Sequence, residues 1–127
     1  MNLETRVAVK AFVTGITGFV GVHLAEHLAS CGDAVLGCAR RVSQTEFQFA
    51  WDVSQPLDAE GPAFARLDEF GPDCIFHLAA LSVPSECGRE QPTPRALAVN
   101  VSGTEHVLDL ARRLASRPRV LLASSCH

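Results

Sequence analysis

The feature that most constrains the fold is a glycine-rich loop between an apolar run and an amphipathic segment near the start of the chain. The run Val7–Thr14 consists mostly of residues that favour β-strands, interrupted by Lys10, which indicates a strand buried on both faces of a parallel sheet. The segment Phe19–Ser30 has apolar residues at three- and four-residue spacing and is followed by Gly32, as expected of a helix and its stop. The order strand, glycine loop and helix predicts the start of a βαβ unit.

The loop itself reads TGITGFVG over residues 14–21 and contains three evenly spaced glycines. Gly15 permits a tight turn out of the strand, Gly18 lets the backbone approach a pyrophosphate, and Gly21 lets the helix pack close to the sheet. Backbone amides at the start of a helix attract phosphates. The loop therefore predicts a dinucleotide site, and a purely structural turn is the alternative. The residues expected to contact the dinucleotide here are Gly15, Thr17, Gly18, Phe19, Val20 and Gly21.

The rest of the chain alternates further strands with helices. Strands are predicted over Ala34–Ala39, Phe47–Trp51, Cys74–Leu78 and Val120–Ser124, and helices over Pro62–Phe70 and Pro94–Ser116. Alternation of this kind implies right-handed crossovers and a parallel sheet. The sequence therefore predicts an α/β fold, a three-layer doubly wound parallel sheet of about five strands. Because 127 residues suit one domain, residues 1–127 are interpreted as a single NAD(P)-binding Rossmann domain.

The end of the second predicted strand indicates which dinucleotide is bound. An NAD site usually has Asp or Glu there, which accepts hydrogen bonds from the ribose 2′-hydroxyl. This chain has Arg40 and Arg41 instead. A guanidinium suits a 2′-phosphate, because it offers a planar fork of donors and a permanent charge. NADP is therefore favoured over NAD, and the alternative is that both arginines only solvate a loop.

Composition and charge exclude several other classes of protein. The net charge of −3 and the scattered arginines provide no basic surface for nucleic acid. The apolar runs are too short to cross a membrane and no signal-peptide pattern is present, so we expect a cytoplasmic protein. Five cysteines without a C-x-x-C pair fit neither a disulfide framework nor a metal site.

With these motifs in place, the sequence resembles the extended short-chain dehydrogenase/reductases, which are NAD(P)-dependent nucleotide-sugar epimerases and dehydratases. Several motifs occur in the order found in this family, from the first strand to the last residue. They are Val13-Thr14-Gly15, Gly21-Val22-His23-Leu24, Trp51-Asp52-Val53, Ile75-Phe76-His77-Leu78-Ala79-Ala80, Asn100-Val101-Ser102-Gly103-Thr104 and Leu122-Ala123-Ser124-Ser125.

The resemblance implies positions for the parts of the cofactor. The amides of Phe19 and Val20 would bind the pyrophosphate, and Arg40 would lie near the adenosine ribose. Asp52 and Val53 would flank the adenine. Asn100 would fix neighbouring backbone. The residues expected beneath the nicotinamide ribose are Leu78, Ala79, Ala80 and Ser82; plain strand packing is the alternative for the motif that contains the first three.

The resemblance also implies a partial catalytic site at the end of the chain. Ser125 aligns with the Ser or Thr that orients the substrate hydroxyl or carbonyl. His127 falls where related dehydratases place a Glu that assists elimination of water, but a terminal residue without a role is the favoured interpretation.

The catalytic Tyr-x-x-x-Lys pair of the family is missing, because the 127 residues include no Tyr and their one Lys is Lys10. We therefore expect the N-terminal cofactor half of a nucleotide-sugar epimerase or dehydratase, truncated after the fifth strand and without a substrate domain. Its nucleotide-sugar substrate would bind only if a C-terminal part completed the protein. We expect a homodimer through the helix after Pro94. The alternatives are a stand-alone NADP-binding sensor or scaffold module, and a degenerate domain that binds no nucleotide.

Overall fold

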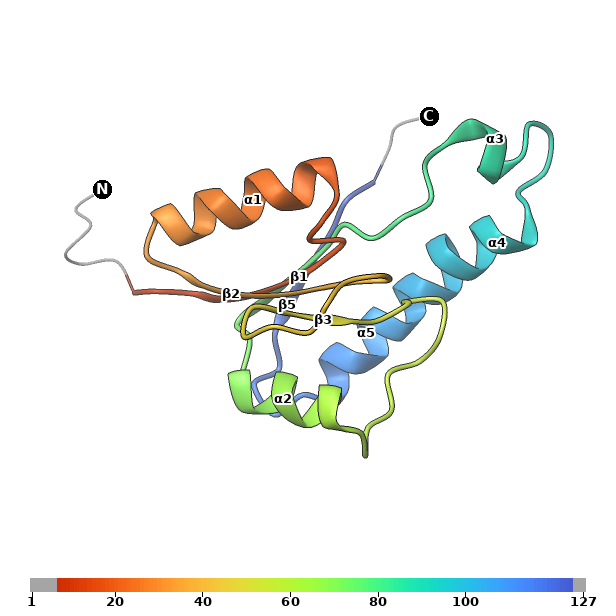
Figure 1. Ribbon diagram of the computed structural model, residues 1–127. Coiled ribbons are helices and arrows are strands. Elements are labelled where there is room, and N and C mark those ends of the chain that lie inside the picture. Colours follow the sequence, from red (N-terminus) through yellow and green to blue (C-terminus); the bar gives the residue numbers. More distant parts are fainter. Residues whose placement is uncertain (1–6, 125–127) are drawn as a thin grey trace.

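The computed structural model describes residues 7–124, which form a five-stranded parallel sheet with helices on both faces (Figure 1). Each neighbouring pair of strands is parallel, and the spatial order is β3-β2-β1-β4-β5. This is a Rossmann-type doubly wound sheet, so the predicted fold class is confirmed. The strands are β1 (Lys10–Thr14), β2 (Ala34–Ala39), β3 (Gln48–Ala50), β4 (Cys74–His77) and β5 (Arg119–Leu122).

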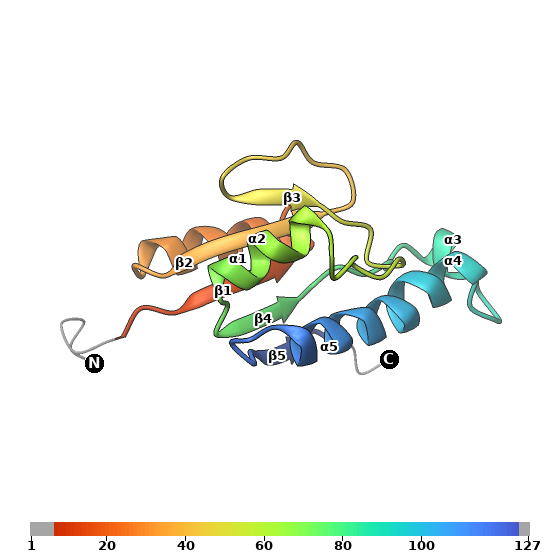
Figure 2. The same ribbon diagram turned by 90° about the horizontal axis from the view of Figure 1, so that it is seen from below.

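The helices are divided between the two faces of the sheet. The helix α1 (Phe19–Ser30) lies on one face, whereas α2 (Pro62–Phe70) and α5 (Gly103–Arg113) lie on the other, where Figure 2 shows them from below. A short helix α3 (Pro84–Cys87) follows the loop after β4, and α4 (Pro94–Leu97) leads towards α5. The crossover from β1 to β2 thus covers one face and the crossovers into and out of β4 cover the other, as right-handed crossovers require when the strand order reverses.

Several predicted boundaries were wrong at their ends. The first strand begins at Lys10, because the N–H of Val9 donates to the Asp33 carboxylate at 2.9 Å instead of continuing the strand ladder. The third and fourth strands are also shorter than predicted, and β5 begins and ends earlier. The predicted helix Pro94–Ser116 ends at Arg113, because Leu114 adopts an extended backbone. The four-residue α3 was not predicted.

The main hydrophobic core lies between the sheet and the helices α2 and α5. Strand residues on this face are buried completely or almost completely, and Phe12 and Phe49 stack with ring centroids 5.7 Å apart. Burial of such side chains is the main favourable term in folding. The core residues are Phe12, Leu36, Cys38, Phe49, Trp51, Val53, Leu67, Ile75, Val99, Val107, Leu110, Ala111 and Leu114.

The predicted long helix is interrupted by a π-helical turn, η2 (Ala98–Ser102), between α4 and α5. The carbonyl of Asn100, which lies within this turn, accepts a hydrogen bond from the hydroxyl of Thr104 in α5 at 2.7 Å. Gly103 follows directly, and a Cβ there would lie 2.9 Å from Cγ2 of Val53. The close approach to Val53 explains why a glycine, otherwise unfavourable inside a helix, occupies this position.

Within residues 7–124, no helix combines the length and the apolar character needed to cross a membrane. The cytoplasmic location expected from the sequence stays a prediction.

Candidate functional site

A pocket of about 700 Å³ opens at the carboxyl ends of the strands. It lies where the strand order changes direction, between β1 and β4, which is the usual ligand site of an open parallel sheet. Its volume suits a cofactor-sized ligand. The lining residues are Gly15, Thr17, Gly18, Ala39, Arg40, Trp51, Asp52, Val53, Leu78, Ala79, Ala80, Leu81, Glu86, Thr93, Arg95 and Val99.

The structure brings most of the predicted site residues to this pocket. Those that line it are Gly15, Thr17, Gly18, Arg40, Asp52, Val53, Leu78, Ala79 and Ala80. Those that lie outside its lining are Phe19, Val20, Gly21, Arg41, Ser82 and Asn100. The predicted catalytic Ser125 and the terminal His127 lie outside the described residues.

The glycine loop forms one end of the pocket through tight backbone contacts. Gly15 has a φ of +69°, and a Cβ there would lie 2.9 Å from the backbone nitrogen of Ala79. The Gly18 N–H donates to the Gly15 carbonyl at 3.0 Å, which closes the turn. Only glycine satisfies both the backbone conformation and the space at position 15.

The start of α1 points an uncapped helix end at the pocket. Gly18 is the N-cap, no side chain accepts a hydrogen bond there, and the first turn contains no acidic residue. The first amides of a helix lack partners inside the helix and form the positive end of its dipole. This end of α1 is therefore suited to an anion such as a diphosphate.

Gly21 serves a different contact from the one predicted. A Cβ there would lie 2.2 Å from the Gly15 carbonyl oxygen and 2.9 Å from Cα of Ile16, so the glycine lets α1 approach the loop and not the sheet. The glycine that makes room on the sheet is Gly37 of β2, where a Cβ would overlap the Ile16 side chain. This role of Gly37 was not predicted.

A buried hydrogen-bond network joins β1, β4 and the loop after β4. The Thr14 hydroxyl oxygen accepts from the amides of Leu78 and Ala79, at 3.0 and 3.1 Å, and lies 2.7 Å from Nδ1 of His77. On the other side of the ring, Nε2 lies 3.4 Å from the Thr104 hydroxyl. This network holds the floor of the pocket in place.

The partners of His77 determine its protonation state. Because both lone pairs of the Thr14 oxygen are used by amides, its proton must be donated to Nδ1, so the ring carries its own proton on Nε2. The Thr104 hydroxyl, which donates to Asn100, is left to accept from Nε2. Burial lowers the pKa of His77, which also favours the neutral ring.

The other end of the pocket is built from side chains at the end of β3. Asp52 Oδ1 accepts from the N–H and the hydroxyl of Ser54, at 3.0 and 2.7 Å. Arg95, from α4, places its Nη2 3.5 Å from Asp52 Oδ2. Burial raises the pKa of Asp52, but the Ser54 hydrogen bonds and the Arg95 charge outweigh burial and leave the pKa below its ordinary value.

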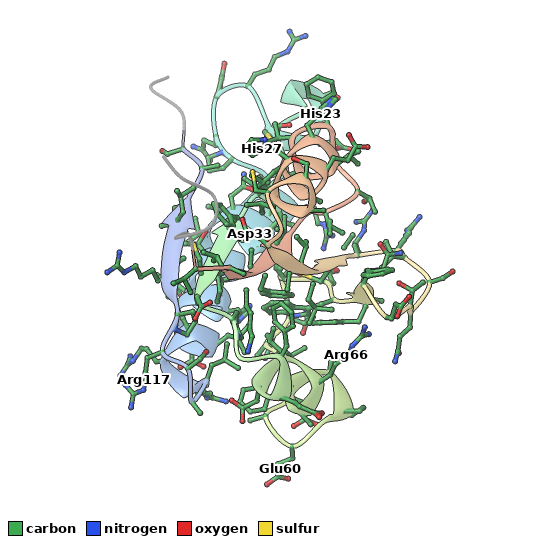
Figure 3. All side chains as sticks on the ribbon, turned by 90° about the vertical axis from the view of Figure 1, so that its left-hand side faces the viewer. His23, His27, Asp33, Glu60, Arg66 and Arg117 are labelled. Atoms are coloured by element: carbon green, nitrogen blue, oxygen red, sulfur yellow. The ribbon has the colours of Figure 1, made fainter. Side chains whose placement is uncertain are left out.

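Two further side chains hold segments near the pocket. Figure 3 shows Arg66 extending from α2, and its guanidinium donates to the carbonyls of Thr45 and of Gln48, the first residue of β3. The Asn100 side chain accepts from the Leu81 N–H at 2.8 Å and donates to the Leu81 carbonyl at 3.0 Å. The start of β3 and the loop after β4, which lines the pocket through Leu81, are therefore held by side chains from helical segments.

The position of Arg95 and the residues around it in the pocket was not predicted. Arg95 is not part of any sequence motif recognised above, and its partner Asp52 lies 43 residues away in the chain. One signal was present: a cation in the first turn of a helix is unfavourable, so an arginine directly after Pro94 needs a compensating partner. Among residues 7–124, no group of three or more His, Cys, Asp or Glu is arranged to hold a metal ion.

The sheet order and the glycine loop together define a Rossmann-type α/β domain. The chain belongs to the NAD dependent epimerase/dehydratase family, which matches residues 11–127. This confirms the resemblance inferred from the motifs.

Individual relatives agree with this family. The UDP-glucose 4-epimerase of Mycolicibacterium smegmatis is 30% identical over 123 residues, which are 91% of this chain and 38% of that protein. The GDP-6-deoxy-D-mannose reductase of Pseudomonas aeruginosa is 33% identical over 101 residues, 78% of this chain and 28% of that protein. The solved structure of MoeE5 in complex with UDP-glucose and NAD has a TM-score of 0.70 and 28% identity, with 92% of this chain and 36% of that one covered.

The chain thus spans about a third of the length of the relatives it matches. These comparisons support a domain of the NAD-dependent epimerase/dehydratase family. They give no support to the alternative of a stand-alone sensor or scaffold module.

Proposed function

We propose that residues 1–127 are the NAD(P)-binding domain of an oxidoreductase that acts on a nucleotide sugar. The observation that carries this proposal is the uncapped start of α1 facing a pocket that the glycine loop lines. The amides there suit the diphosphate of a dinucleotide. The family and the NAD bound to MoeE5 support the same ligand.

Within this proposal, the cofactor is NADP in preference to NAD. Arg40 lines the pocket directly after β2 and offers a guanidinium where an NAD site usually has a carboxylate. Arg41, beside it, is exposed and does not line the pocket. The two arginines therefore have separate roles, of which only that of Arg40 concerns the ligand.

We further propose that this polypeptide binds cofactor without turning it over. The family's proton-transferring Tyr and its Lys have no counterpart among the 127 residues, whose one Lys is Lys10 at the start of β1. Ser125 would orient a substrate when the remaining groups are supplied. The UDP- and GDP-sugar relatives support a nucleotide-sugar substrate but do not favour one base.

A homodimer through the α4–α5 face is part of the proposal. Leu97, Val101 and Leu108 are apolar residues about half exposed along this helical stretch, and large exposed apolar side chains in a row favour association.

The experiment is a titration of the chain with NADPH and NADH, followed by the fluorescence of the reduced nicotinamide, with Gly18→Val as the test variant. Valine fits the extended backbone of Gly18, φ −73° and ψ 171°, and its Cβ would lie 3.3 Å from the Gly15 carbonyl. The variant should fold and place its side chain where a diphosphate would lie. We expect affinity to fall at least about tenfold, the loss of one to two charge-assisted hydrogen bonds.

Gly61→Val is the matched control. Gly61 is the N-cap of α2, with φ −87° and ψ 166°, and its Cβ would lie 3.3 Å from the Asp58 carbonyl. It has the same local geometry but lies outside the pocket lining. Equal loss of binding in both variants, or none in Gly18→Val, would place the nucleotide elsewhere and contradict the proposal.

A further inference from the structure

We propose that Asp52 and Arg95 form a pair that recognises the base of the dinucleotide and selects adenine over hypoxanthine, with Arg95 as a specificity-determining residue. The inference rests on the proposed function. It adds the assignment of Arg95, which comes from a helix that the glycine loop and the strand ends do not include.

The two side chains come from different elements and meet at the pocket. Asp52 follows β3 and Arg95 lies in the first turn of α4, and both line the pocket. Arg95 places Nη2 3.5 Å from Asp52 Oδ2 and Nη1 3.4 Å from the Ser54 hydroxyl. The side chain of Asp52 remains 34% exposed and that of Arg95 41% exposed. The two side chains therefore hold each other in part and remain accessible to a ligand.

The hydrogen-bonding capacity left on each side chain is complementary. A carboxylate offers about four acceptor positions. Ser54 uses two on Oδ1 and Arg95 approaches one on Oδ2, which leaves one acceptor on Oδ2. A guanidinium has five N–H donors, and the contacts with Asp52 and Ser54 use two of them. An acceptor and a donor thus lie next to each other on one wall.

Adenine presents the opposite pattern on its edges. Its exocyclic N6 amino group is a donor, and the neighbouring ring nitrogen is an acceptor. An ionised Asp52 suits the amino group and Arg95 suits the ring nitrogen. Hypoxanthine has an oxygen in place of the amino group and a proton on N1, so both of its groups oppose this pair. The walls beside the pair include Trp51, Val53 and Val99, whose apolar surfaces suit the faces of a base.

Asp52 is the partner that explains a cation at this place. The helix start gives Arg95 no electrostatic support, because a positive charge is unfavourable at the positive end of the dipole. Thr93 caps the helix by accepting from the Ala96 N–H at 3.1 Å, so Arg95 is not needed as a cap. The charge is matched by Asp52, inside the pocket.

The test compares two ligands that differ only in the base: NADH and reduced nicotinamide hypoxanthine dinucleotide. For the unaltered chain, we expect NADH to bind about tenfold tighter, within the range known for paired contacts to a base. In Arg95→Met, which keeps the apolar stem, the ratio should fall below about threefold. Arg95→Lys, which keeps the charge but not the fork, should give an intermediate ratio. Arg112→Met, an exposed arginine near the end of α5, is the control and should keep the full ratio.

Asp52→Asn provides a second test that does not depend on Arg95. The amide can still accept from Ser54 and turns a donor towards the base, so hypoxanthine should bind as tightly as adenine or tighter. A chain that binds NADH and its analogue equally, or an Arg95→Met variant that keeps the full ratio, would overturn the inference and leave the proposed function intact. A chain that binds neither NADH nor NADPH would overturn both.

Discussion

One end of the pocket is formed by backbone contacts and the other by side-chain contacts. At the glycine-loop end, backbone lies against backbone, and a Cβ at Gly15 or Gly21 would meet neighbouring main-chain atoms at less than 3 Å. At the other end, called here the side-chain end, the contacts are between partly exposed side chains, such as Asp52 and Arg95. We infer that a side chain introduced at the glycine-loop end disrupts that whole end, because the backbone leaves no space for it. A substitution at the side-chain end should change the affinity by a smaller amount, which differs from one ligand to another.

The strongest test of this contrast is Gly21→Val. The new Cβ would lie 2.2 Å from the Gly15 carbonyl oxygen, and rigid backbone cannot yield as a side chain can. We expect the variant to lose about 3 kcal/mol of stability, the upper part of the range for overpacking, together with all cofactor binding. Urea denaturation and NADPH titration measure the two effects. The control is Ala29→Val on the exposed surface of the same helix; a similar loss there would mean that a β-branched side chain in this helix, and not the contact with Gly15, is responsible.

The His77 network predicts a pH dependence of stability. Because burial lowers the pKa of His77 in the folded chain, only the unfolded chain gains this proton as the pH falls below about 6.5. Stability is therefore complete above that pH and decreases from there down to the lowered pKa. In His77→Gln this dependence should disappear, and stability at pH 7 should fall by about 1 to 2 kcal/mol, because the hydrogen bond from Thr14 is altered.

Urea denaturation at pH 7 and pH 5 measures this effect. His23→Gln, at an exposed histidine of α1, is the control and should keep the dependence. If His77→Gln also keeps it, another group binds the proton.

Arg40→Gln tests whether side chains of the pocket lining discriminate between ligands. Loss of the guanidinium should weaken NADPH binding about tenfold, the effect of one charge-assisted contact, and leave NADH binding within about twofold. Arg41→Gln, next to it but outside the pocket lining, should change neither. Titration of both ligands against both variants measures the difference. If Arg41 has the larger effect, the 2′-phosphate lies on the other side of the loop.

The smallest effect is expected for Ser54→Ala. This change removes the hydrogen bond from the Ser54 hydroxyl to Asp52 Oδ1 but keeps the one from the backbone N–H, so stability should fall by only about 1 kcal/mol. The pKa of Asp52 should rise, which carbon-13 NMR of the carboxyl group can follow. Ser43→Ala, at an exposed serine between β2 and β3, is the control. No change in the Asp52 titration would show that Arg95 and the backbone N–H of residue 54 keep the carboxyl ionised without the hydroxyl.

The parts of the molecule that local sequence determines were predicted well. The bounds of Phe19–Ser30 and Pro62–Phe70 were correct, because glycines and a proline mark their ends. The glycine loop was recognisable because its backbone conformation allows few residues other than glycine. Its placement against Ala79, in contrast, depends on the pairing of β1 with β4, which the spacing of apolar residues in the sequence does not show.

The contacts between distant segments could not be predicted. The Asp52–Arg95 pair joins residues whose relation appears only when α4 packs beside the end of β3. The hydrogen bond between Thr14 and His77 spans 63 residues and depends on the register of β1 against β4. The π turn has no signal in propensity or apolar spacing, since it differs from an α-helix by a shift of the hydrogen-bond partner.

The π turn has a consequence for how this chain tolerates insertion and deletion. In an α-helix, one residue corresponds to a rotation of about 100°. A π turn spreads nearly the same rotation over one residue more, so deleting one residue within Ala98–Ser102 would restore regular winding and keep the direction in which α4 faces, while Gly103 stayed fixed against Val53. Arg95 would then stay on the wall it shares with Asp52. Deleting one residue of an α-helical turn between Arg95 and Gly103 would, in contrast, rotate Arg95 away from that wall.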